Sequence, residues 1–153
     1  IMALPNIFTS AVSNQMIQRI NQLSPTTVPQ WGKMNVSQML AHCNVTYEMA
    51  FENKHPKPNF FVAFILKTFI KNIIVSETPY KKSSQTAPAF LIKDSRDFEK
   101  EKIRLISYIN KTVEMGEHSF EGRMSLSFGK LSATEWNNMF YKHLNHHLSQ
   151  FGV

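Results

Sequence analysis

The chain has 153 residues, of which 42% are hydrophobic and 18% are charged, and its formal net charge is +6. This length suits one domain, over residues 1–153, with one sizeable core, and the composition excludes a disordered or fibrous chain. The single cysteine, Cys43, excludes an internal disulfide and a cysteine-ligated zinc site.

The positive charge is not organised for nucleic-acid binding. The lysines are scattered and not gathered on one helix with interleaved aromatic residues. Those considered are Lys67, Lys71, Lys81, Lys82, Lys100, Lys102 and Lys142. The first residues lack a basic segment followed by an apolar run, so no signal peptide is predicted. We therefore expect no nucleic-acid partner, and the one cysteine fits a cytoplasmic protein.

Helical spacing of apolar residues dominates the first third of the chain. It predicts a first helix over residues 10–23, which Ser24 and Pro25 end. Asn35 is followed by Gln38 three positions later, the spacing of a capping box. This pair predicts the start of a second helix, which runs to about residue 51.

Residues 60–75, FFVAFILKTFIKNIIV, form the most apolar stretch of the chain. The stretch is too short to span a bilayer comfortably, and Lys67 and Lys71 interrupt it. Together with Thr68 and Asn72 they form one polar stripe on an otherwise apolar helix. The pattern favours a helix that covers one end of the core, with an interfacial membrane helix as the alternative, and no stable membrane insertion.

A third helix follows a loop rich in Pro, Ser and Lys. Asp94 or Ser95 is expected to cap it, and Gly116 is a typical residue just beyond a helix end. Residues 117–130 contain two glycines and show no strong pattern, although they could hold a short extended piece.

The last helix has the second clear start signal, because Glu135 follows Ser132 at capping-box spacing. Four long amphipathic helices are therefore predicted. A long crossing with an extra helix joins the second to the third, and there is no convincing strand pattern. This organisation indicates an all-α fold, a helical bundle.

Three histidines, His143, His146 and His147, crowd the last helix. At about 100° per residue, His143 and His147 fall on its apolar side one turn apart, and His146 falls at the edge. Imidazoles at i and i+4 can converge on one metal ion. The alternatives are a catalytic base with histidine neighbours and a solvated helix face that happens to be rich in histidine.

His42 is the candidate for a third metal ligand. The second helix is apolar nearly all round, so His42 is expected to be buried, and a buried imidazole needs a partner. A backbone carbonyl or Glu48 could be that partner, or a metal ion shared with His143 and His147. Three histidines would leave coordination positions open, as catalytic metals do. Position 144 is leucine, so the HExxH motif of metalloproteases is absent.

Two segments resemble the signature blocks of the DinB-like superfamily, within the branch catalogued only as a domain of unknown function. They are WGKMNVSQMLAHC (residues 31–43) and FGKLSATEWNNMFYKHLNHHLSQFG (residues 128–152). His143, His147 and Gln150 match the usual HxxxHxxQ pattern of the superfamily's last helix. The intervening helices also fit its outline, so the resemblance covers nearly the whole chain.

This resemblance implies a DinB-like four-helix bundle and a divalent metal, zinc or nickel foremost, held by His42, His143 and His147. No ligand position is substituted in this sequence. Characterised members include metal-dependent transferases and isomerases that use small thiols such as glutathione, mycothiol or bacillithiol. The resemblance thus implies a small-molecule substrate and a thiol-dependent S-transferase, or a hydrolase on the same site. Members often form homodimers. The alternative is a non-catalytic, metal-binding or self-associating bundle.

Weaker candidates surround this set. Gln150 could orient a ligand or substrate, and Glu48 or Glu135 could accept the second N–H of a ligand. Three aromatic residues could line a pocket or simply pack in the core: Trp31, Trp136 and Tyr47. Lys81 and Lys82 could bind the carboxylates of a thiol, or they could lie in a solvated loop. His55 and His118 are expected at the surface, and Cys43 as a small buried residue.

Overall fold

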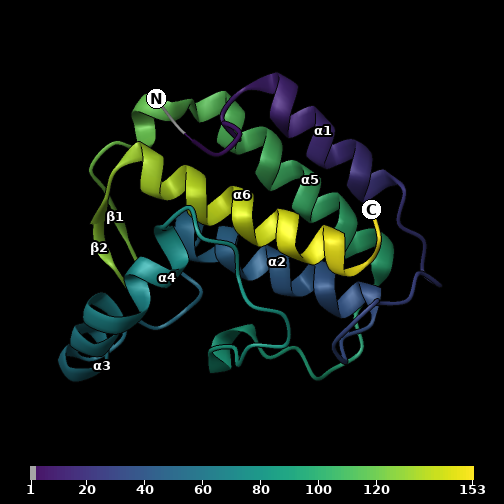
Figure 1. Ribbon diagram of the computed structural model, residues 1–153, viewed down its shortest axis with the longest axis horizontal. Coiled ribbons are helices and arrows are strands. Elements are labelled where there is room, and N and C mark those ends of the chain that lie inside the picture. Colours follow the sequence, from purple (N-terminus) through teal and green to yellow (C-terminus); the bar gives the residue numbers. More distant parts are fainter. Residues whose placement is uncertain (1–2) are drawn as a thin grey trace.

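The computed structural model describes residues 3–153, and this part of the chain is mostly helical. The four long helices are α1 (Ser10–Asn21), α2 (Val36–Phe51), α5 (Phe98–Met115) and α6 (Ala133–Gln150). They lie side by side, and α1 and α2 each pack against both α5 and α6 (Figure 1). The predicted helical organisation is therefore present in the structure.

Two of these helices begin at the predicted capping boxes. Asn35 accepts the backbone N–H of Gln38, and the Gln38 side chain accepts the Asn35 N–H in return. Ser132 and Glu135 make the same reciprocal pair at the start of α6. Each box satisfies two backbone donors that a helix start otherwise leaves unpaired.

Of the two predicted boundaries of α5, only the C-terminal one is confirmed. Gly116 ends the helix with φ +73°, a backbone conformation that glycine adopts without strain. The expected cap at Asp94 or Ser95 is wrong, because Asp97 caps α5 by accepting the N–H of Lys100. The Asp94 carboxylate instead pairs with Arg96, outside the helix.

A long crossing joins α2 to α5 and contains the extra helix, as predicted. Its elements are α3 (Phe60–Ile65), the π-helical turn η1 (Leu66–Ile70), α4 (Lys71–Val75) and the 3₁₀ turn η2 (Pro88–Phe90). The prediction that residues 60–75 cover one end of the core is wrong for α3 and η1, because neither contains a buried residue. Only Val75, at the end of α4, is buried in the core.

The segment before α6 contains strands that the all-α prediction did not include. After the 3₁₀ turn η3 (Glu117–Phe120), strand β1 (Arg123–Ser125) pairs antiparallel with β2 (Gly129–Leu131). The Ser125 hydroxyl donates to the Gly129 carbonyl and accepts the Phe128 N–H, and these bonds close the turn. The hairpin lies where a short extended piece was expected.

The core between the helices is aromatic. Tyr47 stacks on Phe140 with ring centres 4.8 Å apart, and Trp136 packs beside Phe140. Tyr47 and Trp136 are both fully buried there, so they are core residues and not the lining of a pocket. Within residues 3–153, no helix combines the length and the apolar character needed to cross a membrane.

Candidate metal centre

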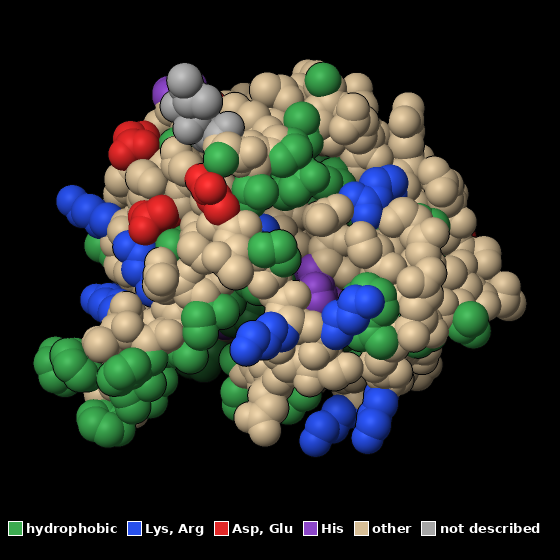
Figure 2. All heavy atoms as spheres, in the orientation of Figure 1, with side chains coloured by type: hydrophobic (Ala, Val, Ile, Leu, Met, Phe, Trp, Pro, Cys, Tyr) green, Lys and Arg blue, Asp and Glu red, His purple; other side chains and the backbone are tan. Residues whose placement is uncertain are grey.

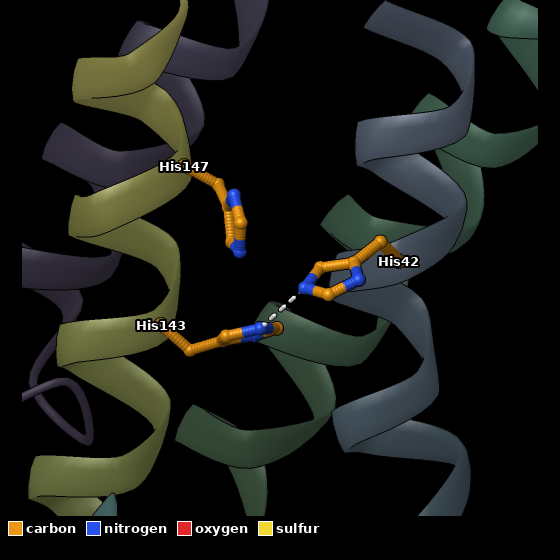
Figure 3. Close-up of side chains that lie close together, drawn as sticks. All are labelled: His42, His143 and His147. Carbon is orange, nitrogen blue, oxygen red and sulfur yellow. Dashed lines mark hydrogen bonds between the residues drawn. The ribbon is translucent and has the colours of Figure 1, made fainter. Parts of the chain in front are cut away.

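Helices α2 and α6 bring His42, His143 and His147 together (Figure 3). One ring nitrogen of each lies within 4.8 Å of those of the other two. The Nε2 atoms of His42 and His143 are 2.9 Å apart. Helical phase predicts His143 and His147, and the apolar surroundings of the second helix predict His42. The structure places all three at one point between the two helices.

Each ring also has a fixed partner on its outer side. The Nδ1 atom of His42 is 2.9 Å from the backbone oxygen of Phe90, which lies in the turn η2 of the long crossing. A carbonyl oxygen only accepts hydrogen bonds, so Nδ1 of His42 carries the hydrogen and donates. In the neutral ring this leaves the lone pair on Nε2, the atom that faces the other histidines.

His147 is oriented by Gln150 on the same helix. Its Nδ1 atom is 2.8 Å from Oε1 of Gln150, while Nε2 of Gln150 donates to the backbone oxygen of Trp31 at 2.7 Å. Because the Trp31 carbonyl fixes which end of the amide is the donor, Oε1 must accept from His147. The Nε2 atom of His147 therefore also keeps its lone pair. The prediction that Gln150 orients a ligand agrees with this contact.

The outer partner of His143 can either donate or accept a hydrogen bond, unlike the partners of the other two rings. The Nδ1 atom of His143 is 3.0 Å from the hydroxyl of Thr46, which is able to donate or accept. Since Nε2 of His42 holds a lone pair, Nε2 of His143 carries the hydrogen that joins the two rings. Transfer of that hydrogen to Nδ1, where Thr46 would accept it, gives three inward lone pairs.

This donor set fits a divalent transition metal. Two imidazole nitrogens on one tetrahedral zinc lie about 3.3 Å apart, so the 2.9 Å pair needs to separate by only a few tenths of an ångström. Metal-ligating histidines usually donate their second N–H to a carboxylate, a backbone carbonyl or water. Here a backbone carbonyl, an amide oxygen and a hydroxyl are in that position.

Burial keeps the three imidazoles neutral. It lowers the pKa of His42, lowers that of His143 well below the ordinary value, and lowers that of His147 to about 3. The neighbouring imidazoles lower the pKa of His143 and His147 further, since two adjacent positive rings repel. Neutral imidazole is the form that binds metal.

His146 lies at the rim of the cluster, as predicted, and is half-buried. Its ring centre is 5.0 Å from that of His147, 5.9 Å from Trp31 and 5.7 Å from Tyr80. Nζ of Lys82 stands 4.3 Å from the Trp31 ring centre. Figure 2 shows a histidine reaching the surface on this face between Lys or Arg side chains.

The two glutamates that were expected to accept a ligand's N–H, Glu48 and Glu135, bond to other residues instead. Glu48 follows His42 by six positions, which turns it about 120° away round α2, where it pairs with Arg104 and His55. Glu135 caps α6 and pairs with Lys71. The prediction for both residues is therefore wrong.

Three other predictions concern residues outside the cluster. His118 is exposed as expected, whereas His55 is half-buried because it bonds Glu48 at 2.8 Å. Cys43 is buried beside Met39, and burial raises the pKa of its thiol, which agrees with a small core residue and not with a nucleophile.

Thr46 and Phe90 are the site residues that the sequence did not suggest. Thr46 follows His42 by four positions, so helical spacing alone places it on the same side of α2. Phe90 contributes a backbone oxygen from a loop, and no side-chain pattern indicates such a contact.

Comparison with known proteins gives a family without an assigned activity. The model of the family described as "Protein of unknown function (DUF1569)" matches residues 8–152 of this chain. No curated protein and no solved structure matches the chain.

Proposed function

Because the chain belongs to the DUF1569 family of proteins of unknown function, we propose its activity from the site itself: a divalent-metal-dependent enzyme. Its ligands are His42, His143 and His147, and its fold is of the DinB-like type. The resemblance of residues 31–43 and 128–152 to the DinB-like signature blocks supports this proposal.

The observation that carries the proposal is that the two nitrogens of each ring have different surroundings. Every Nδ1 atom has a protein partner on the outside, and the remaining nitrogens converge on one point. Core histidines need outer partners as well, so the convergence of the remaining nitrogens on one point is what supports a metal site. Zinc and nickel suit a set of three imidazoles.

When bound, the ion supplies Lewis-acid chemistry, because it lowers the pKa of a coordinated thiol or water. The protein's own rim favours a substrate with a carboxylate. Lys82 supplies positive charge, and the indole N–H of Trp31 is buried without a hydrogen-bond partner among the described residues. Low-molecular-weight thiols such as glutathione carry carboxylates and fit this rim. We therefore favour thiol-dependent S-transfer to a small molecule, with hydrolysis as the neighbouring reaction.

Metal content tests the ligand set first. We expect about one equivalent of a transition metal in untagged wild-type protein by elemental analysis, and its loss in His143→Ala. His146→Ala is the matched control, because it removes a neighbouring imidazole that lies outside the cluster, and it should retain the metal. Absence of metal after incubation with zinc and nickel would overturn the proposal.

Turnover then separates an enzyme from a metal-binding bundle without activity. The metal-loaded protein is incubated with glutathione or bacillithiol and an aryl halide, and loss of free thiol is followed. The thiolate sulfur displaces the halide, so one thiol disappears for each halide released. We expect turnover that His42→Ala abolishes and His146→Ala retains. Tight metal binding with neither loss of thiol nor hydrolysis of a test ester would support the non-catalytic alternative.

A further inference from the structure

A helical projection extends from the bundle beside the β-hairpin (Figure 1). It consists of α3 and η1, residues 60–70, and we refer to it as the α3 projection. Its aromatic side chains are open to solvent: Phe60 is 89% exposed, Phe61 is 70% exposed and Phe69 is 64% exposed. Figure 2 shows hydrophobic side chains gathered at the same corner of the molecule. Isolated apolar side chains are common on protein surfaces, but a group of large ones marks a contact surface.

The exposed apolar side chains form two rows along the helix. The rows consist of Phe61, Ile65, Phe69 and Ile73, and of Phe60 and Phe64. Within each row the residues are four positions apart, so they lie on one side of the helix. The first row continues through α3, η1 and α4 without interruption. An amphipathic helix therefore presents its apolar side to solvent.

Two lysine side chains of this helix contact the bundle, although Lys67, Thr68 and Asn72 are themselves exposed to solvent. Lys71 pairs with Glu135 of α6 at 2.8 Å, and the Lys67 side chain lies against Gly129 of β2. At the root of the projection, Asn138 donates to the backbone oxygen of Val75. A helix that covers a core turns its apolar side to the protein. These contacts hold the apolar rows outward.

Positive charge borders the apolar rows. Residues 53–76 contain four lysines and no aspartate or glutamate. Lys54 and Lys71 pair with glutamates of the bundle, whereas Lys57 and Lys67 have no carboxylate partner within residues 3–153. Lys130 is exposed on the neighbouring hairpin. A partner of this surface therefore needs an apolar interior and negative charge at its boundary.

We propose that the α3 projection docks the protein on an anionic phospholipid bilayer. Its phenylalanines enter the boundary between headgroups and acyl chains, and Lys57 and Lys67 contact lipid phosphates. The helix lies at the interface, since it is too short and too interrupted to span. This inference goes beyond the proposed function and does not depend on the metal.

The charge pattern favours a membrane over a second copy of the chain. In a two-fold symmetric dimer, the same patch faces itself. The lysines of one copy would then approach those of the other, with no carboxylate in residues 53–76 to oppose them. An anionic lipid surface meets both requirements of the patch at once.

Co-sedimentation with vesicles tests the proposal on the full chain. We expect wild-type protein to pellet with phosphatidylcholine vesicles that contain phosphatidylserine, and much less with phosphatidylcholine alone. Added salt should weaken binding, because screening reduces the attraction between lysines and lipid. Lys57→Glu combined with Lys67→Glu should remove the preference for phosphatidylserine.

A double substitution tests the apolar rows. Phe60→Ser with Phe61→Ser should lower vesicle affinity by about tenfold or more, since both rings leave water on binding. Val28→Ser with Ile103→Ser is the matched control, because these side chains are 75% and 65% exposed elsewhere, and it should bind as wild type. The phenylalanine variant should keep the wild-type circular dichroism, melting temperature and metal content.

Three results would overturn the proposal. The first is wild-type protein that stays in the supernatant with both kinds of vesicle. The second is undiminished binding of the phenylalanine variant. The third is a wild-type dimer in sedimentation velocity that the phenylalanine variant disperses, which would assign the α3 projection to a second copy of the chain.

Discussion

Thr46 gives the clearest test of the site at the scale of single residues. Its hydroxyl can donate to Nδ1 of His143 while the ring hydrogen is on Nε2, and it can accept once that hydrogen is on Nδ1. Thr46→Val keeps the shape and removes the acceptor, so metal affinity should fall by about 10- to 100-fold. Competition with a chromogenic chelator measures the dissociation constant.

Thr112→Val is the matched control for this substitution. Thr112 is also a buried threonine on a long helix, but its hydroxyl donates to the backbone oxygen of Tyr108 and lies away from the cluster. Its metal affinity should equal that of wild type. If both variants bind metal equally well, Thr46 does not orient His143.

The lowered pKa values of the histidines predict how the stability of the metal-free protein depends on pH. The pKa of His147 in the folded state is about 3, below the unfolded value of about 6.5, so the unfolded state binds more protons in between. Stability is therefore fully present above about pH 6.5 and falls as the pH decreases toward 3. Between pH 7 and pH 5, His147 alone should cost about 2 kcal/mol.

Urea unfolding of chelator-treated protein at several pH values measures this loss. His147→Asn is the comparison, since its side-chain amide can still donate to Gln150 but does not titrate. The variant should lose less stability than wild type between pH 7 and pH 5. Equal losses in the two proteins would assign the pH dependence to other groups.

The sequence identified the three candidate ligands but only part of their surroundings. Helical phase was sufficient for His143 and His147, because side-chain direction in a helix follows from residue number. The same rule places Thr46, four positions after His42, on the side of α2 that carries His42. The Phe90 carbonyl could not be predicted, since a loop backbone contact depends on the path of a crossing that has no periodic pattern.

At the scale of elements, α6 joins the candidate metal centre to α4, from which the α3 projection extends. His143 and its neighbour Lys142 point in different directions: His143 enters the cluster, and Lys142 donates to the backbone oxygens of Ile73 and Thr78. Lys142 is 5% exposed, so its ammonium is held almost entirely by these two carbonyls and the Tyr80 ring. One helix face thus binds the crossing, and the adjacent face presents the ligands.

Lys142→Met should loosen this attachment. The substitution keeps the length of the side chain but leaves two carbonyls without their donor, which costs about 1–3 kcal/mol for each one that stays buried. Urea unfolding should show the loss of stability, and hydrogen exchange should rise first in α4. Lys100→Met, an exposed lysine on α5, should change stability by less than about 0.5 kcal/mol. Unchanged exchange in α4 would contradict the anchoring role.

Element boundaries were predictable where a local hydrogen bond determines them. Asn35 and Ser132 begin helices because their side chains accept a backbone N–H three positions later, and this depends only on nearby residues. The orientation of residues 60–75 was not predictable in this way. The Lys71–Glu135 pair, which links this stretch to α6, joins residues 64 positions apart in sequence, and no local pattern indicates it.

At the scale of the whole molecule, the apolar core and the candidate metal centre hold the same helices together independently. Buried apolar residues from α1, α2, α5 and α6 form one continuous cluster that does not include the histidines. The polar centre lies between α2 and α6 at the edge of this cluster. We therefore expect the fold not to require a metal, in contrast to zinc fingers, which unfold without it.

Metal removal tests this independence. The chelator-treated protein should keep its helical circular dichroism and a cooperative melt, because the core is complete without the ion. Metal at about 100 times its dissociation constant should add about 2.7 kcal/mol of stability, through binding to the folded state alone. For a chain of this size that raises the melting temperature by about 5–10 °C. His143→Ala should melt at one temperature with or without metal, and His146→Ala should retain the full shift. A wild-type protein that unfolds when metal is removed would show that the ion holds the fold together, which would favour a structural metal over a catalytic one.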